Sequence, residues 1–320
     1  MCIAVFVWQA HPLYPLIIFQ NRDEYHNRET KPLGWWEDCE NGGILGGRDE
    51  VAGGTWMACS KQGRVALLTN VLELHSLPEA RTRGDLPLLF LQSNKSPKEF
   101  AEELVKEAHQ YNGFNLILAD ISSSSSNSMV YISNRPKGEP ILVQEVPPGI
   151  HVISNAKLNS PWHKAQRLEL RFKEELTKYH ESEIPVKEMV EKLMRDKVKA
   201  DKSELPGICA LDWEFNLSSI FVEVDTPLVS IDSFIHYKFK KVVFIYALKL
   251  VSMTWDFCLY LQGRYGTRST AALTAKTNGE VTFYETYLDK DMWKEQTVSY
   301  QIQKLQENGT NPDSEALPHI

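Results

Sequence analysis

The residues best suited to covalent chemistry are Cys2 and a polar NRDE motif at residues 21–24. Apolar runs at residues 3–8 and 16–19 flank a turn signal at His11-Pro12. They predict a β-hairpin that carries the motif back beside Cys2. If Met1 is removed, Cys2 bears both a thiol and a free α-amine, and the amine can take the thiol proton, as in an N-terminal nucleophile.

In that interpretation Asp23 orients the amine, and the positive charge of Arg22 favours the thiolate and depresses the thiol pKa. The alternative is that Cys2 is a small buried strand residue and that the NRDE motif is a polar turn. Buried cysteine is common, so the sequence leaves both interpretations open.

Composition places the chain among globular proteins with a large core, because 42% of its 320 residues are hydrophobic. A net charge of -7 with scattered basic residues argues against nucleic acid as a partner. Five cysteines without a CxxC pair argue against a disulfide scaffold or a zinc site, and favour a reducing, cytoplasmic location. Pro12 and Pro15 interrupt the apolar N-terminal residues, which lack a basic start, so no signal peptide is predicted.

Periodicity predicts blocks of strands and helices rather than βαβ units, which favours antiparallel sheets covered by helices. Glycines at residues 42–54 lack phosphate-loop spacing and indicate tight turns or close backbone approach. A polar tail from Glu295 is expected to be loosely held. The predicted strands cover residues 55–60, 65–69, 115–119, 129–133, 141–146, 150–154, 219–224, 270–274 and 281–286, and the predicted helices cover 85–91, 97–110, 161–178 and 186–198.

Several separated motifs, in order, resemble the NRDE family, also called Transport and Golgi Organization 2. They are MCI at the start, NRDE, GGTW at 53–56, LTNV at 68–71, SN at 154–155 with PW at 161–162, and YGTRS at 265–269. The resemblance implies an α+β fold, an αββα four-layer sandwich of antiparallel sheets covered by helices, like that of the N-terminal nucleophile hydrolases. It also implies one domain over residues 1–294 and a polar tail over 295–320.

Within that superfamily the sequence is most similar to the cysteine amidases, the choloylglycine and penicillin V acylases. The resemblance implies that Cys2 is the nucleophile, that Asp23 holds the α-amine and that Arg22 is a nearby supporting arginine. Amide cleavage needs such a thiolate and base, together with donors for the developing oxyanion.

Three later residues complete the implied catalytic set. Asn70 falls near an oxyanion-hole residue, Asn155 matches an asparagine at a similar strand end, and Arg268 matches a late arginine that faces the thiol. Without the resemblance, Asn155 would be interpreted as a turn cap and Arg268 as part of a surface salt bridge.

No reaction follows from the fold alone. The family is associated with Golgi structure and secretion, with lipid and acyl-CoA metabolism and with intracellular haem movement, in cytoplasm, mitochondria and Golgi. The first hypothesis is therefore a protein that supports Golgi organisation and secretion by handling haem or an acyl lipid. The second is a cysteine amidohydrolase or thioesterase that uses Cys2. No CxxCH motif is present, so haem is considered only as cargo, and membrane association is expected to be non-integral.

Residues 229–262 depart from the family pattern, and deleting them restores it. The segment begins with Val-Ser, which GTAAGT can encode, and ends with Leu-Gln, whose codons can finish in CAG, so we interpret it as a retained intron translated in frame. One alternative is a transmembrane helix at 242–261, in which Lys249 and Asp256 would each cost about 2.5–3.5 kcal/mol near the bilayer centre. The other is a family-specific lid.

Overall fold

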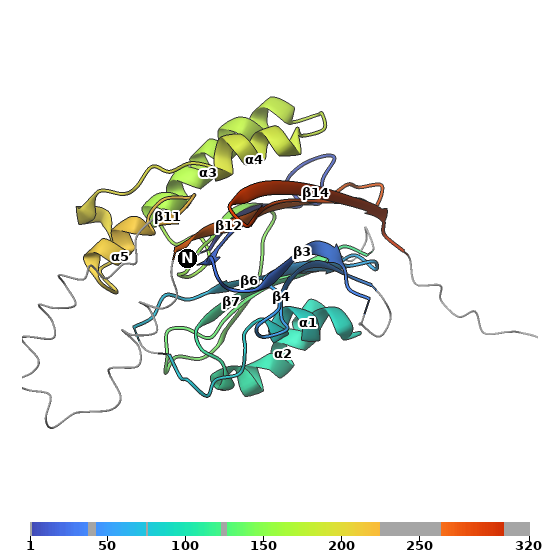
Figure 1. The fold of residues 1–320 in the computed structure, drawn as a ribbon. Helices are drawn as coiled ribbons and strands as arrows, with labels where there is room; N and C mark the ends of the chain where they lie inside the picture. The colour runs from blue at the N-terminus through green and yellow to red at the C-terminus, as the bar shows by residue number, and fades with distance from the viewer. Residues whose placement is uncertain (1, 38–42, 75, 123–126, 225–263, 304–320) are drawn as a thin grey trace, which may run out of the picture.

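Two antiparallel sheets lie face to face in the computed structural model, and helices cover the outer face of each (Figure 1). The structure describes residues 2–37, 43–74, 76–122, 127–224 and 264–303. This arrangement confirms the αββα sandwich that the sequence predicted.

The first sheet has the strand order β10-β1-β2-β12-β13-β14, with β11 paired to β12. Helices α3 and α4 pack on its outer face. Its strands are β1 Ile3–Trp8, β2 Leu16–Tyr25, β10 Gly149–Ile153, β11 Glu223–Val224, β12 Tyr265–Ala275, β13 Glu280–Asp289 and β14 Met292–Gln301, and the helices are α3 His163–Leu176 and α4 Val186–Met194.

The second sheet has the sequential order β3-β4-β5-β6-β7-β8-β9, with α1 and α2 on its outer face. Its strands are β3 Thr30–Trp35, β4 Ile44–Asp49, β5 Met57–Ser60, β6 Arg64–Asn70, β7 Phe114–Asp120, β8 Ser128–Ser133 and β9 Leu142–Glu145. The remaining helices are α1 Asp85–Gln92, α2 Pro97–Glu107 and α5 Leu211–Asn216, with short 3₁₀ turns at Ala108–Gln110, Thr177–Tyr179 and Lys202–Glu204.

Strand β1 is buried on both faces, which explains its uninterrupted apolar sequence. Ala4 and Phe6 contribute to the core between the two sheets, whereas Ile3 and Val5 contribute to the core under α3 and α4. A third core joins the second sheet to α1 and α2. The sandwich therefore has three apolar layers, and Cys2 precedes a strand that lies between two of them.

The NRDE motif lies inside a strand, so the alternative in which it forms a polar turn is wrong. Strand β2 runs between β1 and β12, with Ile3 opposite Asn21 and Thr267 opposite Asp23. The β2–β12 register shifts between Thr267 and Ser269, which makes Arg268 the extra residue of a β-bulge.

Several element boundaries differ from the sequence predictions. The prediction of a loosely held tail from Glu295 is wrong as far as Gln301, because edge strand β14 reaches that residue although most of its side chains are exposed. Strands β3 and β4 were not predicted, since glycines and prolines interrupt their apolar pattern. Helix α4 ends at Met194, where Asp196 accepts the backbone N–H of Val198 and competes with further helix.

Residues 229–262 lie outside the described residues. The retained-intron, transmembrane and lid interpretations of this segment therefore stay predictions. The chain on either side is ordered into paired strands: Val224 of β11 is the cross-strand partner of Tyr265 of β12. Within the described part of the chain, no helix has both the length and the apolar character needed to cross a membrane.

Candidate active site

Cys2 lies immediately before β1, at the end of the sandwich where the chain begins (Figure 1). Its thiol Sγ is 3.9 Å from the backbone oxygen of Asp23, and its own carbonyl accepts a 2.8 Å hydrogen bond from the Ser154 hydroxyl. Continuing the β1–β2 register from Ile3 opposite Asn21 places Cys2 opposite Arg22. Both ends of the residue are thus fixed by neighbouring strands.

Burial raises the pKa of the Cys2 thiol above its ordinary value of 9.0. The positive charges of the amino terminus and of Arg22 act in the opposite direction, while the Asp23 carboxylate adds to the increase. In the chain that still carries Met1, desolvation of the thiolate therefore outweighs the nearby positive charge, and the depressed thiol pKa expected after Met1 removal stays a prediction.

The NRDE residues alternate between the two faces of β2 and so have different neighbours. Asn21 points toward the helices, where its amide donates to the backbone oxygens of Met194 and Ile220 at 2.8 and 2.9 Å. Its Oδ1 accepts a 2.6 Å hydrogen bond from Thr270. Asn21 is fully buried, and all these partners belong to the scaffold, so its role is to join β2 to β12 and to the helical layer.

Asp23 is buried on the helix-facing side of β2, with Oδ1 accepting a 2.7 Å hydrogen bond from Thr267. Its backbone oxygen accepts a 3.2 Å hydrogen bond from the Tyr265 hydroxyl. A second titratable group, Lys164 in the first turn of α3, is also buried and donates to the Leu217 oxygen at 3.2 Å. Burial lowers the pKa of Lys164, and the negative charges of Asp23 and Cys2 oppose that decrease.

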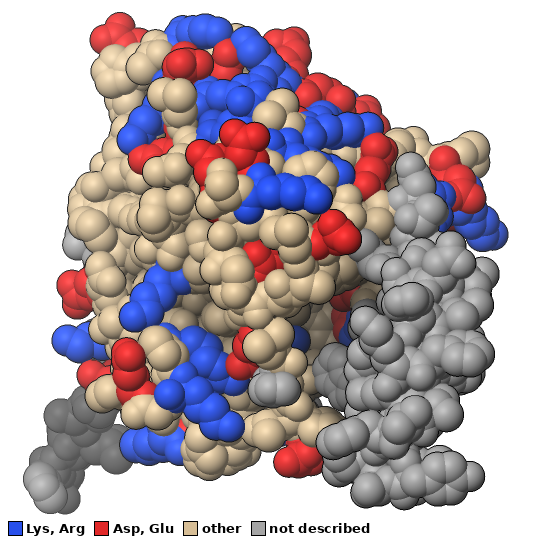
Figure 2. Space-filling view, turned by 90° about the vertical axis from the view of Figure 1, so that its left-hand side faces the viewer, with Lys and Arg blue, Asp and Glu red and all other residues tan. Residues whose placement is uncertain are grey.

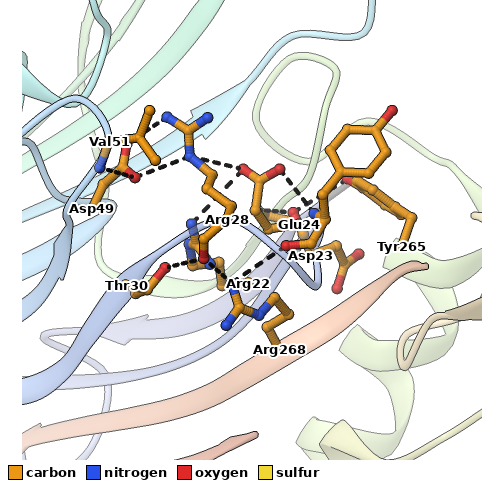
Figure 3. A network of polar contacts seen from close by, with 11 residues as sticks. Arg22, Asp23, Glu24, Arg28, Thr30, Asp49, Val51, Tyr265 and Arg268 are labelled. Atoms are coloured by element: carbon orange, nitrogen blue, oxygen red, sulfur yellow. Dashed lines mark hydrogen bonds and ion pairs between the residues drawn. The ribbon is translucent and has the colours of Figure 1, made fainter. Parts of the chain in front are cut away.

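The opposite side of β2 carries a set of paired charges that we call the paired network (Figure 3). Glu24 lies 3.8 Å from both the Arg22 and the Arg28 guanidinium groups. Arg28 also binds Asp49 through two hydrogen bonds of 2.9 and 2.6 Å. The members of the paired network are Arg22, Glu24, Arg28, Asp49 and Arg268.

Arg268 also belongs to this network. Its Nη1 donates to the backbone oxygen of Arg28 and, at 3.3 Å, to that of Tyr25 (Figure 3). Burial and the charge of Arg22 lower its pKa. These hydrogen bonds hold Arg268 to the end of β2 and to the loop that follows it, and the implied role of an arginine that faces the thiol stays a prediction.

Asn70 and Asn155 lie next to each other on the side of Cys2 toward the second sheet. The Asn155 amide donates to the backbone oxygen of Asn70 at 2.7 Å, and the Ser154 hydroxyl donates to Asn155 Oδ1 at 3.1 Å. Because that hydroxyl also contacts the Cys2 carbonyl, Ser154 links the asparagine pair to the candidate nucleophile. Asn155 is buried and Asn70 is exposed.

The structure thus places Cys2 near Arg22, Asp23 and the asparagine pair, while their catalytic roles stay predictions. Sequence reasoning missed Lys164, which looked like the polar face of an amphipathic helix, and Thr267, which stands beside the more conspicuous Arg268. It also missed Arg83, which lies two residues before α1 and is described below. An isolated arginine before a helix has no distinctive sequence pattern.

The face that carries the N-terminus is hollowed at mid-height, and charged side chains are visible within the hollow (Figure 2). The hollow lies between the half with α3 and α4 and the half with α1 and α2. Among the described residues, no cluster of three or more histidine, cysteine, aspartate or glutamate side chains could hold a metal ion.

Comparison with protein families gives a match over residues 1–290 to the model described as Transport and Golgi organisation 2. The chain belongs to the Transport and Golgi organisation 2 family. A mouse Transport and Golgi organization 2 homolog is 32% identical, covering 94% of this chain and 99% of its own. A human Transport and Golgi organization protein 2 homolog is 30% identical, covering 95% of this chain and 100% of its own.

Among solved structures, this family member is similar to a Caenorhabditis elegans N-acylethanolamine-hydrolyzing acid amidase ortholog, with a TM-score of 0.41, 14% identity, and coverage of 59% of this chain and 84% of that one. It is also similar to the C2A mutant of a conjugated bile acid hydrolase from Clostridium perfringens, with a TM-score of 0.39, 12% identity, and coverage of 95% and 98%. We draw no functional conclusion from similarities this distant.

Proposed function

We propose that this protein supports Golgi organisation and secretion by binding an acyl compound at Cys2 and cleaving its amide or thioester bond. The observation that carries the proposal is the fixed position of Cys2. Its thiol is directed at the end of β2 that holds Asp23, and its carbonyl is bound by Ser154, which also holds Asn155. The names of the mouse and human relatives support the cellular part.

The chemistry requires that Met1 be removed, so that the Cys2 α-amine can accept the thiol proton. The thiolate then attacks the acyl carbonyl and forms a thioester on Cys2, while the proton passes to the departing amine or thiol. Water hydrolyses the thioester, releasing the acid and regenerating the thiol. We assign stabilisation of the oxyanion to Asn70 and to Asn155, whose amide has a second N–H beyond the one bound to the Asn70 oxygen.

A second candidate is a binding role without hydrolysis, in which the protein carries an acyl lipid or haem. The raised pKa of the Cys2 thiol in the chain that retains Met1 supports it, because a protonated thiol is a poor nucleophile. Haem titration followed at the Soret band, together with lipid analysis of the purified protein, tests this candidate. Unchanged haem absorbance and the absence of bound lipid would argue against it.

Intact mass and thiol labelling, followed by turnover of N-acyl amides and acyl thioesters, test the catalytic proposal. We expect mature protein without Met1, an acylated Cys2 intermediate, and a loss of turnover of at least about a thousandfold in Cys2→Ala. Cys209→Ala is the matched control, because Cys209 is also a half-buried free cysteine, and it should keep full activity. A retained Met1 or equal turnover by Cys2→Ala would contradict the proposal.

The cellular part has a separate test, secretion in cells that lack the endogenous protein and receive wild-type or variant chains. If hydrolysis serves secretion, wild type and Cys209→Ala restore it and Cys2→Ala does not. Full rescue by Cys2→Ala would favour the binding role.

A further inference from the structure

Arg83 lies beside the candidate site because two glycine backbones touch. A Cβ on Gly54 would lie 2.4 Å from the carbonyl carbon of Gly84, and the Thr55 N–H donates to the Gly84 oxygen at 3.1 Å. Only glycine allows such an approach. The contact fixes the chain immediately before α1, and with it the half-buried Arg83.

Hydrogen bonds connect Arg83 to the asparagine pair. Its Nη1 donates to the Gly113 oxygen at 2.9 Å, and the same oxygen accepts the backbone N–H of Val71 at 2.9 Å. Val71 follows Asn70, whose oxygen accepts from Asn155. The next residue, Leu72, donates its backbone N–H to the Asn155 oxygen at 2.8 Å. Arg83 is therefore on the same side of Cys2 as the candidate oxyanion donors.

Among the residues that the structure describes, no carboxylate lies within ion-pair distance of Arg83. Glu73, a carboxylate that attracts Arg83 electrostatically, is already occupied: one oxygen accepts the Gly113 N–H at 2.7 Å and the other accepts Arg135 Nε–H at 2.7 Å. In the described part of the chain, the Arg83 side chain forms no ion pair, and its one hydrogen bond is to the Gly113 oxygen. Burial lowers the pKa of Arg83, while its electrostatic attraction to Glu73, Glu24 and Cys2 acts in the opposite direction.

A guanidinium group has five N–H donors in a fixed fork that suits the two oxygens of a carboxylate or phosphate. Arg83 uses one nitrogen on the protein, which leaves donors for a ligand within electrostatic range of the thiol. We propose that Arg83 determines specificity by binding a carboxylate or phosphate on the part of the substrate that leaves the acyl group. The substrate class is then an acyl amide or thioester with an anionic leaving half.

This inference rests on the proposed binding of an acyl compound at Cys2, but it can be tested without hydrolysis. The probes are N-dodecanoylglycine, its neutral counterpart N-dodecanoylglycinamide, and N-dodecanoyl-phosphoethanolamine, titrated calorimetrically into the Cys2→Ala variant. We expect at least one anionic probe to bind about tenfold or more tightly than the neutral amide. The two anionic probes distinguish a carboxylate ligand from a phosphate ligand.

Adding Arg83→Gln should remove the preference for the anionic probe and leave binding of the neutral amide unchanged. Arg81→Gln is the matched control, because exposed Arg81 is paired with Glu107 at 2.9 Å, and it should keep the preference. If Arg83→Gln does not fold, Arg83→Lys retains a charge without the fork and should reduce the preference. Equal affinity for the three probes, no binding of either anionic probe, or a preference that survives Arg83→Gln would overturn the proposal.

Loss of turnover alone does not bear on Arg83. If wild-type protein hydrolyses none of these compounds but the Cys2→Ala variant binds an anionic one through Arg83, the catalytic proposal fails and the recognition proposal stands. In an active enzyme, Arg83→Gln should raise KM for the anionic substrate about tenfold, with little change in kcat.

Discussion

The two groups of charged side chains that flank Cys2 differ in how fully they are paired. In the paired network, Arg28 binds both oxygens of Asp49, and Arg268 binds two backbone oxygens. On the other side, Arg83 has one hydrogen bond to the Gly113 oxygen and, within the described residues, no ion pair. Arg268 and Arg83 are both partly buried, and burial lowers the pKa of each.

This difference separates two uses of a buried charge. Removing a charged group from water costs free energy, which hydrogen bonds within the protein can offset. Arg268 obtains two such bonds through Nη1, from the end of β2 and from the loop after it, and these bonds stabilise the fold although its buried Nε has no hydrogen-bond partner. Arg83 obtains few such bonds, so an anionic ligand can supply the rest.

The largest effect on stability is expected from Arg268→Met, which leaves the backbone oxygens of Arg28 and Tyr25 without their charged donor. We expect the free energy of unfolding to fall by about 2–3 kcal/mol, and by less than about 1 kcal/mol in Arg83→Met. Urea denaturation of both variants measures the difference. Equal losses would remove the distinction between the two arginines.

Deletion of residues 229–262 is expected to have the next largest effect, in the opposite direction. Val224 and Tyr265 are cross-strand partners, so residues 225–228 and 263–264 can connect them directly. The shorter connection should raise the free energy of unfolding by about 1–2 kcal/mol through loop-closure entropy. Urea denaturation checks this value, and transcript sequencing should find a message without these codons. Unfolding of the shortened protein would refute the retained-intron interpretation.

Lys164 is a buried titratable group on the side of the site that faces α3. Its effect on the free energy of unfolding can be measured as a function of pH in wild-type protein and in Lys164→Met. Burial lowers the pKa of Lys164 in the folded protein below 10.5, so between these two pKa values the unfolded chain binds more protons. The free energy of unfolding of wild-type protein should therefore rise with pH across that window. Lys164→Met should lack this rise, whereas the exposed Lys173→Met control on the same helix should keep it. A rise that persists in Lys164→Met would contradict the assignment.

The smallest effect is expected on the titration of Cys2 itself. In protein that retains Met1, the rate of alkylation should show an inflection above pH 9.0, because burial raises the pKa of the thiol. Arg22→Gln should move the inflection higher, since it removes a positive charge that stabilises the thiolate. Arg48→Gln is the matched control: Arg48 lies 4.6 Å over the ring of Trp36, much as Arg22 lies 4.2 Å over that of Trp56. A downward shift in Arg22→Gln would show that the sign is wrong.

The predictable part of the structure is the part that periodicity governs. Apolar runs and the turn at His11-Pro12 were enough to predict the hairpin that returns the NRDE motif to Cys2. The β-bulge at Arg268 could not be predicted, because no sequence pattern marks one extra residue in a strand. The position of Arg83 depends on the contact between Gly54 and Gly84. These two glycines are distant in the sequence and have no side chains, so no sequence pattern predicts their contact.

The pairing of β2 with β12 also sets an order of events during translation. Thr267 binds the Asp23 carboxylate and follows it by 244 residues in the sequence. At a translation rate of about 5–20 residues per second, Thr267 is synthesised on the order of 10–50 s after Asp23. Until β12 leaves the ribosome, that edge of β2 has no partner strand, and the site around Cys2 cannot close. Enzymes that trim the start of a nascent chain therefore have this interval in which to act before the fold covers their substrate.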